Sequence, residues 1–418
     1  MKTCSDRNIL RFLWVLMLLF ALPLTQAQAL TPNDPMYPLN YAFTATSAPA
    51  AWDITTSDST VKIGVVDSGL DLDHPDLAAH INTTDDYDFV NTDAVAQDDH
   101  GHGTAMAGII GAVTNNGTAI AGVNWQGTLL PVKVLNAELG TSQATAAQGI
   151  AWASGKGAKV ICMGFVFTST TTALDNAITA AYNGGATLVA PMGNDGGSYT
   201  RYPAANSYVI AVGSVGPGKT VSSFSNRGSH IDVVAPGETI PTTYLNDAVD
   251  TVQGTSYAAA YVAGVVSLLY AVNPNLTPAE VYTIISTTAK DLGASGYDST
   301  YGYGLVDVYA AVRAAQVTTK VQPRAANGTG TPASLTPQFV WSSVSGETSY
   351  RVVVKTGAAG TVLADTIVTG TSVLIPSGSY SPALVFGTTY YWNVKPILGR
   401  WSTFDTFTPT AAAAPVTV

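Results

Sequence analysis

The chain has 418 residues, which is long enough for two or three domains and a sizeable hydrophobic core. Hydrophobic residues make up 46% of the chain and charged residues only 11%, so the composition predicts a dense globular protein with a sparsely charged polar surface. The formal net charge is -10 at pH 7 and no basic stretch is present to neutralise phosphates, so we expect no nucleic-acid partner. The acidic surplus suits solubility or divalent cations.

The first 29 residues have the pattern of an export signal. Lys2, Arg7 and Arg11 give a positive start, residues 12–24 form an apolar run, and Ala29 ends a small-x-small cleavage motif. The apolar run is short for a transmembrane helix, so we expect cleavage after Ala29 and no stable membrane span afterwards. The alternative is an uncleaved anchor.

The cysteine content predicts no internal disulfide in the mature chain. Cys4 lies inside the predicted signal, so Cys162 is the only cysteine expected in the mature chain. An exported protein without internal disulfides must be stabilised in another way, for example by a large core or by bound metal.

Two polar motifs follow the start of the mature chain. After a polar, turn-rich opening, residues 62–66 form an apolar run with β-branched residues, which predicts a buried strand. Asp67 follows at once, at the carboxyl end of this strand, where open α/β sheets place their chemistry. His102 lies between two glycines, which permit close backbone approach, and precedes a predicted helix at 105–111. Both have ordinary alternatives, because Asp-Ser-Gly is a common turn and most isolated histidines are structural.

The middle of the chain alternates between strands and helices. Predicted strands span residues 128–135, 159–163, 188–192, 209–212 and 231–235, and predicted helices span residues 142–156 and 172–183. The alternation predicts a mostly parallel sheet with helices on both faces. Asn194 follows one of these strands, where its amide could donate to an oxyanion, although Gly-Asn is also a common turn pair. Further helices are predicted from a capping box at 277–280 and over 305–315.

Ser256 lies at the start of a long apolar run. The sequence Gly254-Thr255-Ser256 predicts a tight turn that delivers the serine to the first turn of a buried helix. There, free N–H groups and the helix dipole favour developing negative charge. Ser256 is therefore a candidate nucleophile if a histidine and a carboxylate reach it, or else an ordinary N-cap.

Together these motifs resemble those of the subtilisin-like serine proteases, most closely the thermitase branch. Four segments occur in the order and context of that family: Val65-Val66-Asp67-Ser68-Gly69, Gly101-His102-Gly103-Thr104, Met192-Gly193-Asn194 and Gly254-Thr255-Ser256. The similarity covers about residues 31–315, and four motifs in register make the match very specific.

The resemblance implies an α/β fold, with a mostly parallel sheet flanked by helices, and a serine endopeptidase that acts on polypeptides. It implies Ser256 as nucleophile and His102 as general base and then acid. Asp67 would orient and stabilise the imidazolium, and the Asn194 side chain and the Ser256 N–H would form the oxyanion hole. The pattern of residues agrees, because groups on different elements meet at the carboxyl edge of one sheet.

The resemblance also implies two structural Ca²⁺ sites. The first would use Asp88, Asn91, Asp93, the Val95 carbonyl and Gln97. The second would use the side chains of Asp34, Asp76 and Asn116 and the carbonyls of Val113, Thr118 and Ile120. The second site would pin the N-terminus to the domain, whereas Asn91 in place of a carboxylate weakens the first. The alternative in both cases is a solvated acidic loop.

The chain departs from the family pattern around the substrate. Gly164-Phe165-Val166-Phe167 stand where the family usually has Ser-Leu-Gly-Gly, and Pro191-Met192 replace two small residues on the opposite wall. Since glycines let a substrate backbone come close, we expect Val166 and Phe167 to narrow or re-aim the primary specificity pocket. Elsewhere, Ala105, Ala260 and Tyr261 replace a family His, Pro and His.

The family's usual inhibitory propeptide has no counterpart between the predicted signal and the predicted protease domain. We therefore expect the protease to fold unaided, or calcium or a separate chaperone to take the role of the propeptide.

After residue 315 the composition changes. Residues 317–336 form a predicted linker rich in Thr, Ala, Gly and Pro, and residues 337–418 predict an antiparallel sandwich of roughly seven strands. This part resembles a bacterial fibronectin type III module, with Trp341 and the Tyr390-Tyr391-Trp392 strand as core aromatics. It contains no catalytic constellation, so we expect a spacer or a module that binds an unknown surface ligand.

The sequence thus predicts a signal peptide (1–29), a subtilisin-like protease domain (30–316), a linker (317–336) and a fibronectin type III-like sandwich (337–418). The predicted function is a secreted, extracellular or envelope-associated endopeptidase stabilised by calcium. The alternative is a catalytically weak or inactive protein that binds peptides at a surface, which only the altered pocket residues support. An esterase or lipase is disfavoured because Ser256 lacks a Gly-x-Ser-x-Gly elbow and because the aspartate precedes the histidine and serine.

Overall fold

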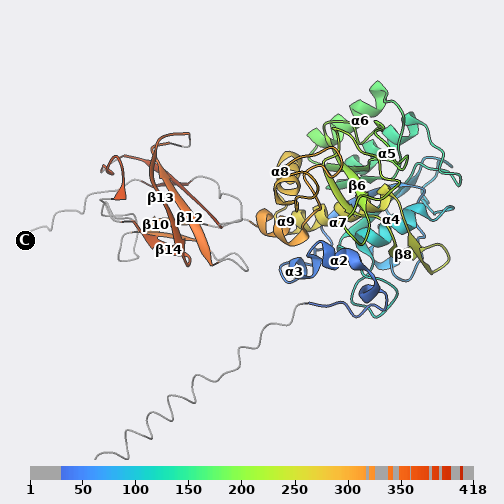
Figure 1. Ribbon diagram of the computed structural model, residues 1–418, viewed down its shortest axis with the longest axis horizontal. Helices are drawn as coiled ribbons and strands as arrows, with labels where there is room; N and C mark the ends of the chain where they lie inside the picture. Colours follow the sequence, from blue (N-terminus) through green and yellow to red (C-terminus); the bar gives the residue numbers. More distant parts are fainter. Residues whose placement is uncertain are drawn as a thin grey trace, which may run out of the picture.

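The computed structural model describes residues 30–316 without a gap. Beyond them it describes residues 320–324, 338–341, 348–357, 359–375, 379–385, 388–396 and 405–407. The predicted signal peptide, residues 1–29, lies outside the described residues. Figure 1 shows an α/β body up to residue 316 and a β body after it.

One parallel sheet of seven strands, in the order β2-β3-β1-β4-β5-β6-β7, organises the α/β body. Its strands are β1 (Lys62–Asp67), β2 (Tyr87–Asp88), β3 (Thr128–Lys133), β4 (Val160–Met163), β5 (Thr187–Pro191), β6 (Val209–Val215) and β7 (Val233–Pro236). Most of these strands are short apolar runs that are buried throughout, as parallel strands covered on both faces require. The predicted α/β fold class, with a mostly parallel sheet flanked by helices, is confirmed.

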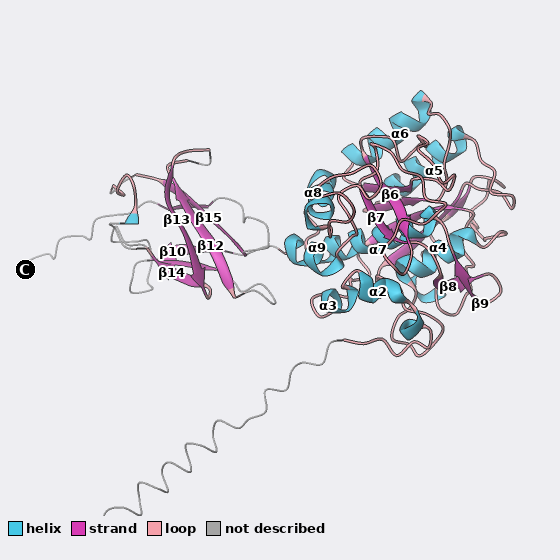
Figure 2. Cartoon of the chain, in the orientation of Figure 1, coloured by secondary structure: helices cyan, strands magenta, loops and turns pink. Residues whose placement is uncertain are grey.

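Helices cover both faces of the sheet (Figure 2). One face carries α4 (His102–Gly111) and α7 (Thr255–Val272), with α2 (Tyr41–Ala45), α3 (Ala48–Trp52), α8 (Pro278–Thr288) and α9 (Val308–Ala315) in the same core cluster. The other face carries α5 (Gln143–Gly155) and α6 (Thr172–Asn183). The alternation of side chains along β1 divides the two cores, because Val65 packs with α4 and α7 whereas Val66 packs with α5 and α6.

Helix α7 lies inside the body. Its 18 residues are long and apolar enough to cross a membrane, but 89% of them are buried, which marks a core helix. With Ala260 in place of the family's proline, the helix runs without interruption. The hydroxyl of Tyr261, which is 1% exposed, lies 2.6 Å from Thr46 Oγ1 and so joins α7 to the end of α2.

Cys162 lies in β4 and is a buried free thiol. β4 pairs with β1 on one side and with β5 on the other, so Cys162 is in the middle of the sheet. Burial raises the pKa of this thiol well above 9.0.

Several elements differ from the prediction. The turn-rich opening contains α2 and α3, and a hairpin of β8 (Ile240–Tyr244) and β9 (Ala248–Val252) was not predicted. The last helix of the body begins at Val308 rather than at 305, because Leu305 pairs its backbone with Lys290 and Val234 instead. The carboxylate of Asp307 then caps the helix by accepting the Ala310 N–H.

The described residues after 316 form two antiparallel sheets, in the orders β10-β11-β14 and β13-β12-β15-β16. The strands are β10 (Lys320–Arg324), β11 (Gln338–Trp341), β12 (Ser349–Lys355), β13 (Val362–Thr369), β14 (Ser372–Leu374), β15 (Tyr390–Pro396) and β16 (Asp405–Phe407). Phe339 of one sheet contacts Trp392 of the other at a ring-centroid distance of 4.9 Å, so the sheets pack face to face. β10 falls inside the predicted linker, because it pairs with β11 and begins the β body before residue 337.

Candidate active site

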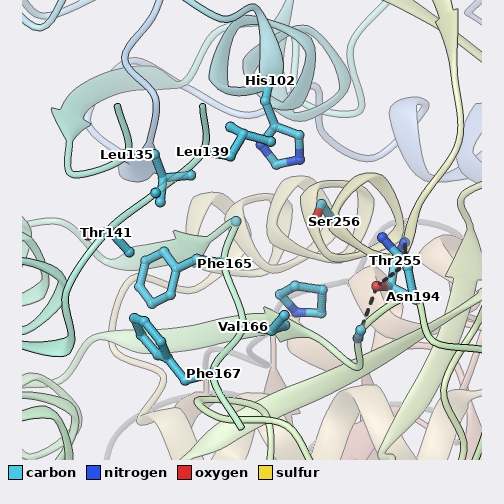
Figure 3. Close-up of a pocket in the computed structure, with 14 residues that line it drawn as sticks. His102, Leu135, Leu139, Thr141, Phe165, Val166, Phe167, Asn194, Thr255 and Ser256 are labelled. Atoms are coloured by element: carbon cyan, nitrogen blue, oxygen red, sulfur yellow. Dashed lines mark hydrogen bonds between the residues drawn. The ribbon is translucent and has the colours of Figure 1, made fainter. Parts of the chain in front are cut away.

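Four predicted residues lie at the carboxyl edge of the parallel sheet. Asp67 ends β1, His102 begins α4, Asn194 follows β5, and Ser256 is the second residue of α7. His102, Asn194 and Ser256 line one cavity of about 410 Å³ (Figure 3). The other lining residues are Leu135, Leu139, Gly140, Thr141, Gly164, Phe165, Val166, Phe167, Pro191, Gly193 and Thr255.

Asp67 and His102 form a direct polar contact at the site. His102 Nδ1 lies 2.8 Å from Asp67 Oδ1, and the Asp67 side chain is fully buried. The carboxylate accepts the Nδ1 proton, which leaves Nε2 as the ring nitrogen able to take another proton. Burial lowers the pKa of His102, but the charge of Asp67 and its hydrogen bond outweigh that effect and raise the pKa above 6.5.

The turn that carries His102 is held by Asp98, which the sequence did not single out. Its Oδ1 accepts the N–H groups of His100 and Gly101, and its Oδ2 accepts the N–H and hydroxyl of Thr104. The carboxylate therefore closes the first turn of α4 around His102. A buried Asp before a glycine-rich helix start is the pattern that could have indicated this role.

Lys133 links this turn to the end of β1. The side chain is 1% exposed, and Nζ donates to the Ser68 carbonyl and to Asp99 Oδ1, at 2.6 Å each. Ser68 follows Asp67 directly, and Asp99 lies in the turn that carries His102. The ammonium group therefore links the segment that carries Asp67 to the turn that carries His102.

Asn194 is oriented by Thr255, another residue that the sequence did not single out. Asn194 Oδ1 accepts the Thr255 N–H at 2.9 Å and the Thr255 hydroxyl at 2.8 Å, so the Nδ2 group remains free to donate toward the cavity. Gly193 turns the chain with φ of +96°, and a Cβ there would lie 2.6 Å from Asn226 Nδ2.

Ser256 is 8% exposed, and its N–H has no partner among the described residues. No hydrogen bond of the described chain joins His102 to Ser256, although both line the cavity. An N–H at the start of a helix, together with the Asn194 amide, can stabilise an oxyanion beside Ser256 Oγ.

Gly164 allows Asp67 to take its position. A Cβ at Gly164 would overlap Asp67 Oδ2, which is buried and has no hydrogen-bond partner within the described residues. The family's serine at this position would therefore collide with the carboxylate as it lies here.

The predicted wall residues differ in position. Val166, Phe167 and Pro191 line the cavity, whereas Met192 is completely buried in the core behind it. The expectation that Met192 forms part of the pocket wall is therefore not met. Figure 3 shows Leu135 and Leu139 on the cavity wall, which the sequence did not indicate because they come from a loop without a recognisable motif.

The second predicted calcium set comes together around two buried carboxylates. The N–H groups of Asn115 and Asn116 donate to Asp34, at 2.8 and 3.2 Å. Asn116 Nδ2 and the Ile120 N–H donate to the two oxygens of Asp76, at 2.8 and 3.0 Å. The segment at Asp34 is thus fastened to the loop at 113–120.

The donor set at this place suits a hard cation. Asp34 and Asp76 are 2% and 0% exposed, and no lysine or arginine of the described chain forms an ion pair with either. Burial raises the pKa of Asp76, and the charge of Asp34 raises it further. The predicted carbonyl ligands accept no hydrogen bond from described residues; they are those of Val113, Thr118 and Ile120. Carboxylate and carbonyl oxygens of this kind fit Ca²⁺.

The first predicted calcium set is divided between two networks. Asp88 accepts the Asn91 N–H and amide, and Asp93 accepts the N–H of Val95. Gln97 instead donates to Asp71 at 3.2 Å. No group of three or more His, Cys, Asp or Glu side chains suited to a metal occurs among the described residues, and this holds for the Asp34 and Asp76 cluster as well as for this set. The hydrogen bonds therefore do not gather this set around one point.

A family model described as the subtilase family matches residues 58–304. Thermitase from Thermoactinomyces vulgaris is 38% identical over 284 residues, covering 68% of this chain and 99% of that protein. The thermophilic serine proteinase of Bacillus sp. (strain AK1) is 38% identical over 285 residues, covering 68% of this chain and 70% of that protein. A solved structure of proteases from Pseudoalteromonas arctica PAMC 21717 matches with a TM-score of 0.64 at 32% identity, covering 69% of this chain and 100% of that chain.

Proposed function

Because this chain belongs to the subtilase family and is a serine-type endopeptidase, we propose that Ser256 is its nucleophile, with His102 as general base and Asp67 as the partner of His102. The substrates are polypeptides. The observation that carries the proposal is the 2.8 Å contact between His102 Nδ1 and Asp67 Oδ1, beside a cavity that Ser256 and Asn194 also line.

In the proposed reaction, Ser256 Oγ attacks the scissile carbonyl carbon while its proton moves to His102 Nε2. The Asn194 amide and the Ser256 N–H stabilise the charge that develops on the carbonyl oxygen. The carbon–nitrogen bond then breaks, and His102 gives its proton to the leaving amine. Water attacks the acyl-enzyme, its proton passes through His102 to Ser256, and the carboxylic acid product leaves.

We also propose a structural calcium site at Asp34, Asp76 and Asn116, with the carbonyls of Val113, Thr118 and Ile120 as further ligands. Two buried carboxylates that form no ion pair, and three carbonyls that accept no hydrogen bond, within the described part of the chain support it. Bound there, the cation would offset the two negative charges and hold the N-terminal segment against the domain. We do not extend this proposal to Asp88, Asn91, Asp93, Val95 and Gln97, whose hydrogen bonds are divided between two networks.

Export is proposed from the pattern of residues 1–29. A relative from Natrialba magadii, 38% identical over 287 residues, is named an extracellular serine protease. For the β body we propose a fibronectin type III-like spacer or binding module, supported by its two packed antiparallel sheets.

Labelling with a fluorophosphonate probe tests the proposed nucleophile. We expect the full chain to be labelled and Ser256→Ala to lose the label, while Ser223→Ala, which changes an exposed serine outside the cavity, keeps it. If folded, calcium-loaded protein were not labelled, the proposed nucleophile would be wrong. That result would favour the alternative function, a catalytically weak or inactive protein that binds peptides.

A further inference from the structure

We propose that Val166 limits the size of the substrate side chain that immediately precedes the scissile bond, so that the protease prefers small residues such as alanine there. This inference rests on the proposed function, because it takes Ser256 and Asn194 as the groups that hold the scissile carbonyl. It concerns substrate choice and leaves the chemistry unchanged.

The segment that contains Val166 continues β4 beyond Met163 and forms one wall of the cavity. Side chains alternate along it. Phe165 and Phe167 contact each other with ring centroids 5.5 Å apart. Figure 3 shows Val166 turned away from this pair, between the phenylalanines and Asn194. Val166 is 39% exposed, so its side chain occupies open space in the cavity rather than the core.

The position of the scissile carbonyl determines which wall residue the neighbouring side chain meets. The carbonyl carbon would lie at Ser256 Oγ and the carbonyl oxygen at the Asn194 amide. The side chain that precedes the scissile bond is carried by the Cα bonded to this carbonyl carbon, so it enters the cavity beside these two groups. Val166 lines the cavity, and Figure 3 draws it between the two phenylalanines and Asn194. Figure 3 shows Phe165 and Phe167 on the side of Val166 away from Asn194, so the apolar space near them serves substrate residues farther upstream.

The backbone of the segment supports this placement. The backbone groups of Phe165 and Val166 make no hydrogen bonds with other described residues, so an extended substrate can pair with them as an added strand. Phe167 is already paired, because its N–H donates to the Tyr202 carbonyl at 2.6 Å and its carbonyl accepts the Tyr202 N–H at 2.9 Å. This pairing anchors the wall directly after Val166, so the valine cannot easily withdraw from the cavity.

We expect Val166 to have a large effect on the preference between substrates. A hydrophobic pocket that misfits by a single methylene discriminates by about 10- to 200-fold, and a benzyl group is several carbons larger than a methyl group. For two peptides that differ only before the scissile bond, we expect kcat/KM for alanine to exceed that for phenylalanine by about tenfold or more.

Variants of Val166 in the full chain test the inference with these two peptides. We expect Val166→Gly to raise the phenylalanine-to-alanine ratio of kcat/KM by about tenfold or more, and Val166→Ala to raise it by less. Val166→Thr is the matched control, because threonine has nearly the same shape, and it should leave the ratio unchanged.

Two results would overturn the inference: equal cleavage of both peptides by the wild type, or ratios that stay constant in Val166→Gly and Val166→Ala. Fluorophosphonate titration of each variant separates this failure from failure of the proposed function. Labelled protein with unchanged ratios rejects only the role of Val166, whereas absence of labelling in the wild type rejects Ser256 as the nucleophile.

Discussion

The contact between Asp67 and His102 sets the pH range in which His102 can act as a base. Burial of the ring lowers the pKa of His102, but the adjacent carboxylate raises it by more, to a value above 6.5. In the proposed mechanism, the neutral ring is the form that accepts a proton from Ser256. We therefore expect kcat/KM to fall as the pH drops through a midpoint above 6.5.

Asp67→Asn should move that midpoint to lower pH, because burial of His102 remains while the charge that opposes it is removed. It should also lower kcat by roughly 10⁴-fold, as loss of this partner does in other serine proteases. Kinetics over a pH series check both effects, with Asp365→Asn in the β body as a control that should leave the midpoint unchanged. A midpoint that stays in place in Asp67→Asn would contradict the assignment.

The raised pKa of His102 also affects the stability of the fold, with a pH dependence opposite to the one expected for activity. Since the folded protein binds a proton on His102 more tightly than the unfolded chain does, this interaction stabilises the fold fully below the unfolded pKa of about 6.5. The stabilisation is lost as the pH rises through the raised pKa. If His102 is the base, we expect the site to be most active in the pH range where His102 contributes least to stability.

Sequence motifs indicated the four side chains of the candidate site but not the residues that position them. Asp67, His102, Asn194 and Ser256 follow recognisable turns, whereas Asp98 and Lys133 act through hydrogen bonds to turns that only the fold brings together. The overlap between Gly164 and Asp67 likewise depends on the side-chain orientation, which a sequence does not specify.

At the scale of elements, the N-terminal segment is fastened by the cluster of Asp34 and Asp76. If calcium binds there, it stabilises the fold by about 2.7 kcal/mol when its concentration is 100 times the dissociation constant. We expect the melting temperature of the wild type to rise with added calcium and to fall with chelator. Asp76→Asn should remove this dependence, because it deletes one of the two buried charges.

Differential scanning calorimetry across a calcium series makes this measurement. Asp93→Asn, in the acidic loop to which we assign no calcium, is the matched control and should keep the calcium response. An undiminished response in Asp76→Asn together with a lost response in Asp93→Asn would move the site to the other loop.

The elements that were predicted well are those with long or regular patterns. Helix α6 (Thr172–Asn183) has the predicted bounds, because a capping threonine and a clear apolar face mark it. Helices α2 and α3 have five residues each, too short to show a helical period. The hairpin of β8 and β9 was missed because it packs on α4 through the hydroxyls of Thr242 and Thr243, which donate to helix carbonyls, rather than through alternating apolar residues.

At the scale of the whole molecule, the described cores are separate. The two clusters of the α/β body contain no residue beyond 315, and the cluster of the β body begins at Phe339. We expect a chain that ends at Gln316 to fold and to cleave short peptides with unchanged kcat/KM. Activity assays and calorimetry on this shortened protein check the expectation, and loss of folding would show that the β body stabilises the protease.

Cys162 has a consequence for how the stability of this protein can be observed. The thiol is buried in β4 between two other strands, and its raised pKa keeps it protonated. A thiol-specific reagent can therefore reach it only after the middle of the sheet has opened. A protease tends to digest its own opened chains, which hides unfolding from most equilibrium methods. A reagent that modifies Cys162 reacts with the opened chain before that chain is digested. The rate of modification therefore reports how often the core opens in the working enzyme.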